Sequence, residues 1–498
     1  MLVVLGATGD LCKKKIFPSI DKMLRAVLYK CTKTKYIQSE IETAPGTLSS
    51  GSSKDALQDS PLTQANPADM RKRVSYHTAE PGKVNVTEIG QGDIIRNSKI
   101  EVPEIIGYGR SELSTAEFIR KIDPSINFMK ETVKSISYIH GPYEECLERV
   151  ERYMEEKRGG IGDETVFLYM AVPQEVYPAI IEQVRRKRDR RLVILAEKPH
   201  GTSQESFREI EKQVEGMESR LLCVDHYLFK NVVLQMPKIL SGSVVGELLV
   251  PECVEGVKAY FKEVIGAEGQ IGHFNKAGIC RDVLQNHLLQ FVAIILSRSS
   301  SKIDVLSKIA PLDAKKTKFG VYRGYREVLK KERVEQGPLE TYVKTRSKIG
   351  GEWDGTPLKI ECGKKMKTHF VGVRVKLNAK GVERVFRYRA GRADFENPKK
   401  MAQCKGPGDQ ELEAYVRVEI TPKEEVTVDL MRKKALLKRV KVPLERSPDG
   451  ASPYQLLFTQ LLLKKEYSEN FALPEEIREQ WRIVEPILDH TDIEVIDY

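Results

Sequence analysis

A short apolar run followed at once by a glycine turn and a helical stretch is the feature that most restricts the fold. Residues 1–5 have the pattern of a buried strand, the turn GATGDL occupies 6–11, and a helical pattern continues to about Cys31. This order of strand, glycine turn and helix opens a dinucleotide-binding unit, in which parallel strands alternate with helices. The same alternation returns beyond residue 100. Further strands are predicted at 104–109, 165–172 and 191–199, and further helices at about 115–134, 143–156 and 176–188.

Two other parts of the chain have a different character. The stretch 34–99 is crowded with Ser, Gly, Thr, Asn, Asp and Pro, so we predict a flexible surface insertion there. After about Asp225, β-branched residues alternate in runs such as VGVRVKL and EVTVDLM, which favours an antiparallel sheet. We therefore predict an α/β, Rossmann-like dinucleotide-binding domain over 1–225. An α+β domain with a mainly antiparallel sheet flanked by helices should follow over 226–498.

Composition narrows the class of protein. With 498 residues, 41% hydrophobic and 31% charged, the chain can build large cores, which excludes a disordered or collagen-like protein. The net charge of +10 is spread out, and the basic cluster RRKRDRR at 185–191 lacks aromatic residues, so we expect a solvated helix end and no nucleic-acid partner. Eight cysteines without a CxxC pair predict reduced, mostly buried thiols. No apolar run approaches about 20 residues and no signal-peptide pattern is present, so we expect a soluble protein without a membrane partner.

Two motifs indicate a bound nucleotide. Gly6 permits the tight turn after the first strand, and Gly9 lets backbone amides approach a pyrophosphate at the helix N-terminus. Arg110 and Ser111 follow the strand at 104–109, where an acidic residue would normally hold the ribose hydroxyls of NAD. An arginine there favours the 2′-phosphate of NADP. The alternatives are a plain strand-to-helix turn and a solvated arginine.

Two further motifs carry polar side chains that can contact a ligand, and the first of them lies at a predicted strand end. Lys198, in EKP, ends a central parallel strand, and ligands of such sheets bind outside those ends. A charge that merely ends the strand is the alternative. In VDHYLFK, Asp225 precedes His226, Tyr227 and Lys230, whose side chains offer a phosphate three kinds of donor. The alternative is a helix N-terminus capped by Asp225.

The segment 278–296 is strongly helical, and its histidine lies on the apolar face. His287 is surrounded by leucine and phenylalanine residues at helical spacings of three and four. Asp282, Asn286 and Gln290 form a polar stripe on the neighbouring face, which a purely structural helix would not need. A histidine that is simply satisfied within the core is the alternative for His287.

Together these motifs resemble the glucose-6-phosphate dehydrogenase family. The segments GATGDLCKKK, EKPHG, CVDHYLFKN and GICRDVLQNHLLQ are similar to the family's GASGDLAKKK, EKPFG, RIDHYLGKE and GIIRDVMQNHLLQ. FLYMAVPQEVY, KEVIGAEG, CGKKM and QWRIVEPIL also match, in the family's order. The resemblance spans nearly the whole chain outside 34–99.

The resemblance implies an NADP-dependent oxidation of D-glucose 6-phosphate to 6-phospho-D-glucono-1,5-lactone, the first step of the oxidative pentose phosphate pathway. His287 matches the general base that takes the proton of the 1-hydroxyl while hydride leaves carbon 1 for the nicotinamide, and Asp225 matches the carboxylate that orients the imidazole. Lys198 matches a catalytic lysine between sugar and cofactor. The implied cofactor ligands are Gly6, Thr8, Gly9, Asp10, Leu11, Arg110, Ser111, Tyr177, Lys198 and Pro199. The implied substrate ligands are Lys198, His226, Tyr227, Lys230, Glu263, Asp282, His287 and Lys364.

The chain departs from the family pattern at two places near the expected phosphate. The family has an arginine a few residues after Lys364, whereas this chain offers only Lys367 or His369. Neither provides a bidentate fork, so we expect a lower affinity for phosphate. In the DHYL segment, Cys223, Phe229 and Asn231 stand where the family has arginine, glycine and glutamate, and the bulk of Phe229 is expected to shift Lys230.

Some members of the family bind a second, structural NADP. Arg374, Arg417 and Trp481 lie at matching places, although both arginines also fit as ordinary outward residues of alternating strands. The resemblance further implies a cytoplasmic homodimer or homotetramer. No metal site is expected.

Two other interpretations stay open on the sequence. A sugar oxidoreductase of the glucose-fructose oxidoreductase type would account for the first three motifs but not for DHYL or RDVLQNHLLQ. A catalytically impaired, NADP-binding regulatory protein would account for the absent arginine and the altered residues around DHYL. Against it, Lys198, Asp225 and His287 are all retained.

Overall fold

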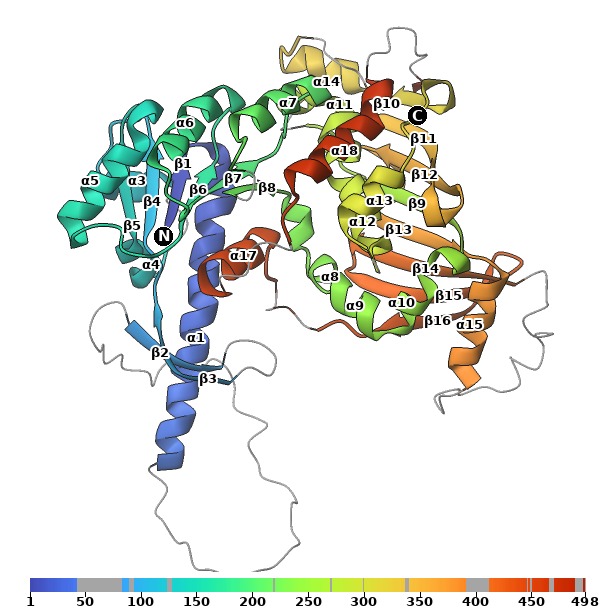
Figure 1. Ribbon diagram of the computed structural model, residues 1–498, viewed down its shortest axis with the longest axis horizontal. Helices are drawn as coiled ribbons and strands as arrows, with labels where there is room; N and C mark the ends of the chain where they lie inside the picture. The colour runs from blue at the N-terminus through green and yellow to red at the C-terminus, as the bar shows by residue number, and fades with distance from the viewer. Residues whose placement is uncertain are drawn as a thin grey trace, which may run out of the picture.

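The computed structural model describes most of the chain. The described residues are 1–42, 83–88, 94–122, 128–217, 220–268, 271–298, 300–335, 340–390, 412–445, 447, 450–464, 470–488 and 496–497. They form two large sheets, each with its own helices (Figure 1).

The first sheet has six strands, and all neighbouring strands are parallel. In spatial order they are β5 (Ile136–His140), β4 (Ile105–Gly109), β1 (Leu2–Leu5), β6 (Val166–Met170), β7 (Leu192–Glu197) and β8 (Leu221–Val224). If only these six strands are counted in chain order, their spatial order is 3-2-1-4-5-6, which is that of a doubly wound dinucleotide-binding fold. The predicted Rossmann-like class is therefore confirmed. Ligand sites of such sheets lie beyond the carboxyl ends of the strands.

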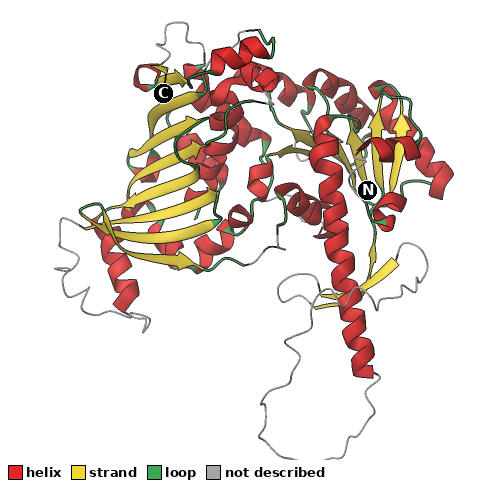
Figure 2. Cartoon of the chain, turned by 180° about the vertical axis from the view of Figure 1, so that it is seen from behind, coloured by secondary structure: helices red, strands yellow, loops and turns green. Residues whose placement is uncertain are grey.

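Helices connect these strands and pack around the sheet (Figures 1 and 2). They are η1 (Cys12–Ile16), α1 (Phe17–Glu42), α3 (Thr115–Ile122), α4 (Lys130–Ser135), α5 (Cys146–Arg158), α6 (Tyr177–Lys187) and α7 (Gln204–Gln213). The single helix predicted at 115–134 was wrong, because Pro124 cannot continue a helix and two short helices form instead. The strand β5 that follows them and the edge strand β8 were not predicted.

The predicted insertion at 34–99 contains regular structure at both ends. Helix α1 runs eleven residues beyond the predicted end at Cys31, to Glu42, because TKTKYIQSEIE contains neither glycine nor proline. Near the other end, β2 (Lys83–Glu88) and β3 (Ile94–Glu101) pair as an antiparallel hairpin. The remainder of the predicted insertion lies outside the described residues.

The second sheet has nine strands and is mostly antiparallel, as predicted. In spatial order they are β16 (Ala435–Val442), β15 (Glu425–Arg432), β14 (Leu412–Thr421), β13 (Phe370–Leu377), β9 (Val254–Lys262), β12 (Thr356–Gly363), β11 (Tyr342–Ile349), β10 (Lys318–Val321) and β17 (Ile496–Asp497). The pairs β9–β12 and β10–β17 are parallel. Buried and more exposed residues alternate along β11, β12 and β14, so one face of the sheet is covered.

Helices cover the face of the second sheet that is turned toward the first sheet (Figures 1 and 2). The helical elements of this part are α8 (Asn231–Leu234), α9 (Met236–Gly242), α10 (Val244–Leu248), α11 (Ile271–Ile279), η7 (Cys280–Leu288), α12 (Leu289–Leu296), α13 (Lys302–Lys308), α14 (Tyr325–Lys331), α15 (Ala379–Ala390) and α18 (Pro474–Val484). η7 contacts β9 and α12 contacts β13, so this helical layer lies between the two sheets.

The chain returns to the first sheet after the last long strand. Helix α17 (Pro453–Phe458) packs against α1, and the Ser19 and Ser452 hydroxyls lie 3.0 Å apart. Ala472 exchanges two backbone hydrogen bonds with Cys223 and so covers part of the edge strand β8. The first sheet ends at Val224 and the second begins at Val254, whereas the boundary at 225/226 stays a prediction.

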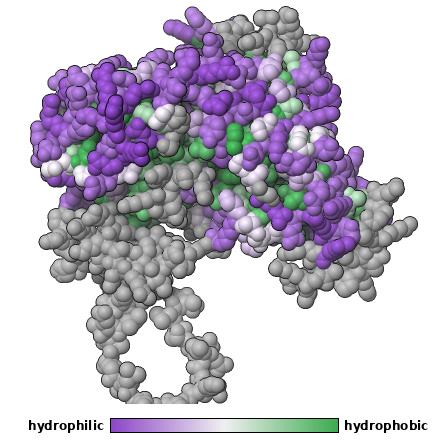
Figure 3. Space-filling view, viewed as in Figure 1, coloured by the Kyte–Doolittle hydropathy of each residue, from purple (hydrophilic) through white to green (hydrophobic). Residues whose placement is uncertain are grey.

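Apolar side chains fill both layers, while the face seen in Figure 3 is mostly hydrophilic. The helical stretch Phe274–Leu296 is long and apolar enough to cross a membrane, but 89% of its most apolar window is buried inside the protein. The fold thus accounts for its composition. Six cysteines among the described side chains are free and buried, as predicted: Cys12, Cys146, Cys223, Cys253, Cys280 and Cys362.

Candidate active site

The carboxyl ends of two neighbouring strands place the predicted catalytic residues. Lys198 directly follows β7, and Asp225 directly follows β8. Helix η7 of the second sheet's helical layer lies against them and contributes Asp282 and His287. The site therefore lies between the two sheets, where a doubly wound fold binds its ligands.

His287 is the centre of this cluster. Its Nδ1 lies 2.7 Å from Asp225 Oδ1, and its Nε2 lies 3.1 Å from the Lys198 ammonium. The side chains of His287 and Asp225 are 2% and 1% exposed. The ammonium can only donate, so it donates to Nε2, and Nδ1 must carry the proton that is donated to Asp225. The residue is thus held in the tautomer whose Nε2 can accept a proton.

Charges fix the protonation of the groups around His287. Burial alone would lower the pKa of Lys198, but the charge of Asp282 at 3.0 Å, with those of Asp225 and Glu197, raises it. Burial alone would raise the pKa values of Asp225 and Asp282, but His287 and Lys198 respectively outweigh burial, and both pKa values are lowered. Lys198 is therefore an ammonium that contacts the Asp282 carboxylate and the His287 imidazole.

The helix that carries His287 is wound as a π-helix over Cys280–Leu288. Such segments are rare and occur often at functional sites. Asp282 reaches Lys198, whereas the side chain of Gln290 is fully buried and donates to Glu476 of α18. The Asn286 carbonyl accepts a hydrogen bond from Gln480. The polar stripe predicted on this helix is therefore not one functional face, because Gln290 is part of the packing against α18.

His226 and Tyr227 lie beside the catalytic cluster. The Tyr227 ring centroid is 4.6 Å from that of His287, and the His226 ring meets His287 edge-on at 5.4 Å. Burial lowers the pKa of His226 to about 3, so its imidazole is neutral. Asp225 also accepts the Tyr227 backbone N–H at 2.9 Å. The helix-cap alternative for Asp225 is therefore realised together with its contact to His287.

Phe229 points into the core and does not occupy the site. Its side chain is fully buried and packs edge-on against Phe471 at 5.1 Å. Lys230, the next residue, is 26% exposed, and its ammonium lies 3.7 Å from Glu424. The large side chain that replaces glycine is thus accommodated away from Lys230.

Lys364 and Glu263 form a second charged pair, 2.5 Å apart. The backbone of the 363–366 loop is held along Glu263 and Ile265 by three hydrogen bonds. The Lys364 charge also contributes to lowering the pKa of Asp282. Of the two predicted substitutes for the absent arginine, His369 is exposed and bonded to Thr421 at 2.8 Å.

The glycine turn suits a dinucleotide. Gly6 has φ +75°, and a Cβ there would lie 2.3 Å from the Ala171 carbonyl oxygen, so only glycine fits. Gly9 and Asp10 are exposed, and Thr8 and Leu11 are half-buried. The turn therefore presents backbone next to open space at the start of η1, as phosphate binding requires.

The remaining predicted cofactor residues are placed in different ways. Arg110 is exposed after β4, with its guanidinium 5.9 Å from the Tyr143 ring centroid. The Ser111 carbonyl accepts the Tyr138 hydroxyl at 2.8 Å, and the Pro199 carbonyl accepts a hydrogen bond from Gln174. Tyr177 is buried, and its hydroxyl donates to the Glu197 carbonyl at 3.1 Å. Its hydroxyl thus supports the end of β7.

Of the three residues that match ligands of a structural NADP, Arg374 and Arg417 lie together, whereas Trp481 has other contacts. Arg374 and Arg417 are register partners on β13 and β14, and both guanidinium groups lie 5.0 Å from the Phe370 ring centroid. Trp481 is 1% exposed, and its indole N–H donates to the His200 carbonyl at 2.8 Å. Trp481 therefore packs against the loop after Lys198. We find no contact in the described residues that joins it to the two arginines.

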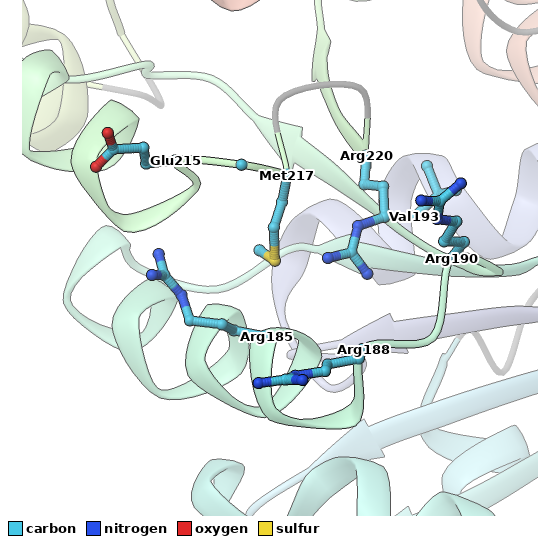
Figure 4. A pocket seen from close by; sticks show the side chains of 8 residues that line it. Arg185, Arg188, Arg190, Val193, Glu215, Met217 and Arg220 are labelled. Atoms are coloured by element: carbon cyan, nitrogen blue, oxygen red, sulfur yellow. The ribbon is translucent and has the colours of Figure 1, made fainter.

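The basic cluster at 185–191 lies at the opposite end of the strands. Helix α6 ends at Lys187, and Arg188 follows with φ +50°. Arg185, Arg188, Arg190 and Arg220 surround an open hollow at the amino ends of β7 and β8 (Figure 4). The predicted solvated helix end is confirmed, and the cluster is separate from the site at the carboxyl ends.

Ligand atoms of Asp225, His226 and His287 lie within 4.8 Å of one another, as a metal site would require. Asp225 Oδ1 and His287 Nδ1 already share a hydrogen bond, so the arrangement serves a proton better than a cation. The expectation of no metal stays a prediction.

A second buried cluster, beside Lys198, was not predicted from the sequence. Glu197 accepts hydrogen bonds from the Tyr169 and Tyr454 hydroxyls at 2.6 and 2.7 Å. Tyr454 is 257 residues from Glu197 along the chain, so no local spacing could reveal this contact.

Comparison with known families covers most of the chain. Residues 95–235 match the family model "Glucose-6-phosphate dehydrogenase, NAD binding domain", and residues 242–498 match "Glucose-6-phosphate dehydrogenase, C-terminal domain". The first match begins at residue 95, so the glycine turn and the first strand of the hairpin lie outside it.

Similar curated proteins and solved structures carry related names. "Glucose-6-phosphate 1-dehydrogenase 5, cytoplasmic" from Arabidopsis thaliana is 26% identical over 436 residues, covering 78% of this chain and 79% of that protein. Glucose-6-phosphate 1-dehydrogenase from Encephalitozoon cuniculi is 26% identical, covering 79% and 88%. The structure of glucose-6-phosphate 1-dehydrogenase from Mycobacterium avium superposes with a TM-score of 0.66 at 20% identity, covering 100% of this chain and 93% of that one. A glucose-6-phosphate dehydrogenase in complex with its substrate gives 0.66 at 21% identity, with the same coverage. At this identity the two structures bear on the fold alone.

Proposed function

This chain belongs to the glucose-6-phosphate dehydrogenase family, and on that premise we propose how its site works. The reaction is the oxidation of D-glucose 6-phosphate to 6-phospho-D-glucono-1,5-lactone with NADP. The observation that carries the proposal is the hydrogen-bonded row Asp225–His287–Lys198–Asp282 at the carboxyl ends of β7 and β8. Asp225 and His287 are buried, and Lys198 and Asp282 are half-buried. Nothing in a structural core requires two carboxylates, an imidazole and an ammonium in contact.

His287 is the general base in this proposal. Its Nε2 takes the proton of the sugar's 1-hydroxyl, and Asp225 stabilises the imidazolium that forms. Lys198 covers Nε2 in the free protein, so the substrate hydroxyl must displace it. The ammonium has a second partner in Asp282 at 3.0 Å, which lets it move aside without losing its charge partner.

The cofactor site fits NADP by the same reasoning. The exposed backbone of Gly9 at the start of η1 and the close approach permitted at Gly6 suit the pyrophosphate, and the exposed guanidinium of Arg110 suits a 2′-phosphate. When bound, NADP supplies the acceptor for the hydride from carbon 1. Lys198 then faces both the sugar and the cofactor.

We assign the substrate's phosphate to His226, Tyr227 and Lys230. Burial raises the pKa of Tyr227 and lowers that of His226 to about 3, so a neutral hydroxyl and a neutral imidazole N–H act beside one ammonium. In this proposal Glu263 and Asp282 bind sugar hydroxyls and Lys364 binds the edge of the phosphate; the contacts of Lys364 with Glu263 and of Lys198 with Asp282 support it. A sugar oxidoreductase of the glucose-fructose oxidoreductase type would not need these phosphate ligands. An impaired protein is disfavoured because Phe229 leaves Lys230 accessible.

The proposal includes a cytoplasmic location and assembly as a homodimer or homotetramer. The six buried free thiols suit a reducing compartment. A sheet with one covered face offers the surface through which copies can associate.

The test is absorbance at the NADPH wavelength with purified protein, glucose 6-phosphate and NADP. Parallel reactions contain NAD, free glucose, the His287→Ala protein and, as a control, the Asp163→Asn protein, whose carboxylate is fully exposed. We expect turnover that needs the phosphate and that falls by about three orders of magnitude in His287→Ala only. Binding of NADP without turnover would refute the proposal and favour the impaired protein.

A further inference from the structure

A buried carboxylate directly beside Lys198 has no role in the reaction as described so far. Glu197 is the last residue of β7 and is buried. Its Oε1 accepts two hydroxyl hydrogen bonds, from Tyr169 of β6 and Tyr454 of α17, and its Oε2 accepts the Lys198 backbone N–H at 3.2 Å. All three partners donate, so the carboxylate form fits the pocket.

Tyr454 contacts both this carboxylate and the imidazole of His226. Its ring stacks on the His226 imidazole with the centroids 5.5 Å apart and the planes 9° apart. His226 in turn meets His287 edge-on. Tyr454, which lies in the C-terminal part of the chain, therefore contacts both Glu197 and His226, one of the proposed phosphate ligands.

Helix α17 is held firmly enough to position that side chain. Ser452 caps its first turn by accepting the Gln455 N–H, and the Ser452 hydroxyl also meets Ser19. Tyr169, the second donor to Glu197, packs against Phe458 of the same helix at 5.9 Å. The hydroxyl and the ring of Tyr454 thus have fixed partners on both sides.

Resting on the proposed function, we infer that Tyr454 is a positioning residue for this reaction. Its hydroxyl holds the Glu197 carboxylate, which fixes the backbone from which Lys198 extends, and its ring holds His226 for the substrate's phosphate. Loss of the hydroxyl is therefore expected to lower kcat, whereas loss of the ring is expected to raise KM for glucose 6-phosphate.

The titration of Glu197 gives a readout that mere packing would not move. Burial raises the pKa of Glu197, and the hydrogen bonds from Tyr169 and Tyr454 and the Lys198 charge oppose that rise. The titratable groups facing Glu197 are Tyr169 on β6, Tyr454 on α17, Lys198 after β7, Tyr177 on α6 and Cys12 at η1. Loss of one hydroxyl should raise the pKa of Glu197 and move the acid limb of the kcat profile to higher pH.

The experiment compares four variants of the full chain. Tyr454→Phe keeps the ring, and we expect kcat to fall about tenfold, the acid limb to move up, and KM for glucose 6-phosphate to stay within about twofold. Tyr454→Leu should lose the ring as well and also raise KM. Tyr169→Phe removes the other hydroxyl without touching His226, so it should repeat the effects on kcat and the acid limb. Tyr325→Phe, a buried tyrosine outside the site, should change neither constant.

The outcomes separate the two claims. An active wild type whose kcat and acid limb are the same in Tyr454→Phe overturns the inference and leaves the proposed function intact. If Tyr454→Phe does not fold, Tyr169→Phe decides, and an unchanged acid limb in that variant overturns the inference. A wild type without turnover refutes the proposed function and the inference with it.

Discussion

Replacing Asp225 by asparagine tests the division of labour at the centre of the site. Asp225 Oδ1 accepts both the His287 Nδ1–H at 2.7 Å and the Tyr227 N–H at 2.9 Å, and no described residue bonds its buried Oδ2. An asparagine can place its carbonyl oxygen at Oδ1 and its amide at Oδ2. The geometry and the tautomer of His287 are then kept, and only the negative charge is lost.

The loss of charge sets the size of the effect. Two unit charges about 4 Å apart interact by about 4 kcal/mol at an effective dielectric constant of about 20. In the transition state the proton is between half and fully transferred to His287. Loss of the Asp225 charge therefore removes about 2 to 4 kcal/mol of transition-state stabilisation, which corresponds to about a 30-fold to 10³-fold fall in kcat. KM for glucose 6-phosphate should change little, because Asp225 does not touch the proposed phosphate ligands' charged ends.

The assay is steady-state kinetics on Asp225→Asn beside Asp163→Asn. Asp163 is fully exposed and has only a 3.8 Å ion pair with Arg191, so its substitution should be silent. A fall in kcat of less than about threefold in Asp225→Asn would refute the reasoning from charge. A rise in KM with kcat preserved would mean that Asp225 binds substrate and does not assist the base.

Four other substitutions test separate parts of the structure. Arg110→Ser should lower kcat/KM for NADP about 10-fold to 100-fold and leave that for NAD nearly unchanged, because only NADP carries the 2′-phosphate; equal losses in steady-state assays with each cofactor would contradict this. Lys230→Ala should mainly raise KM for glucose 6-phosphate, and a fall in kcat alone would show its role to be misassigned. Phe229→Ala should cost about 3 to 5 kcal/mol in urea unfolding because the side chain is fully buried, and a cost below about 1 kcal/mol would show that its packing matters little. Burial lowers the pKa of His200 to about 4, so the unfolded chain binds a proton that the folded chain does not between about pH 6.5 and 4, and stability falls as pH drops through that window; His200→Phe should therefore lose about 2 kcal/mol less than wild type between about pH 7 and 5, and equal losses in urea titrations would count against it.

Lys198 was the most predictable residue of the site. The apolar run that ends at it is continuous, and ligands of such sheets bind outside the carboxyl ends of the strands. The strand β8 before Asp225 was not predicted, so strand topology could not show that Asp225 lies at the same edge as Lys198. His287 was recognisable because helical spacing placed a titratable group among leucines. What the sequence pattern could not decide was whether Gln290 faced a ligand or another helix, since the partner, Glu476, lies far along the chain.

Other features depended on packing that no local pattern encodes. The strand β5 was overlooked because its five residues follow a helix without a glycine, and the direction of Phe229 depends on a cavity formed by Phe471. The Glu197 cluster needed the return of α17 to the first sheet. In each case the deciding contact joins segments that are distant in the chain, which is why the residues themselves gave no sign.

The return of the chain to the first sheet has a consequence for how the protein is made. Residues 1–445 contain both large sheets apart from β17, as well as Lys198, Asp225 and His287, but they lack Tyr454 and the Ala472 segment that covers β8. A ribosome must therefore release the chain beyond residue 472 before Glu197 and the edge of β8 lose their contact with water. Until then the nascent protein presents an unpaired strand edge to which a chaperone can bind.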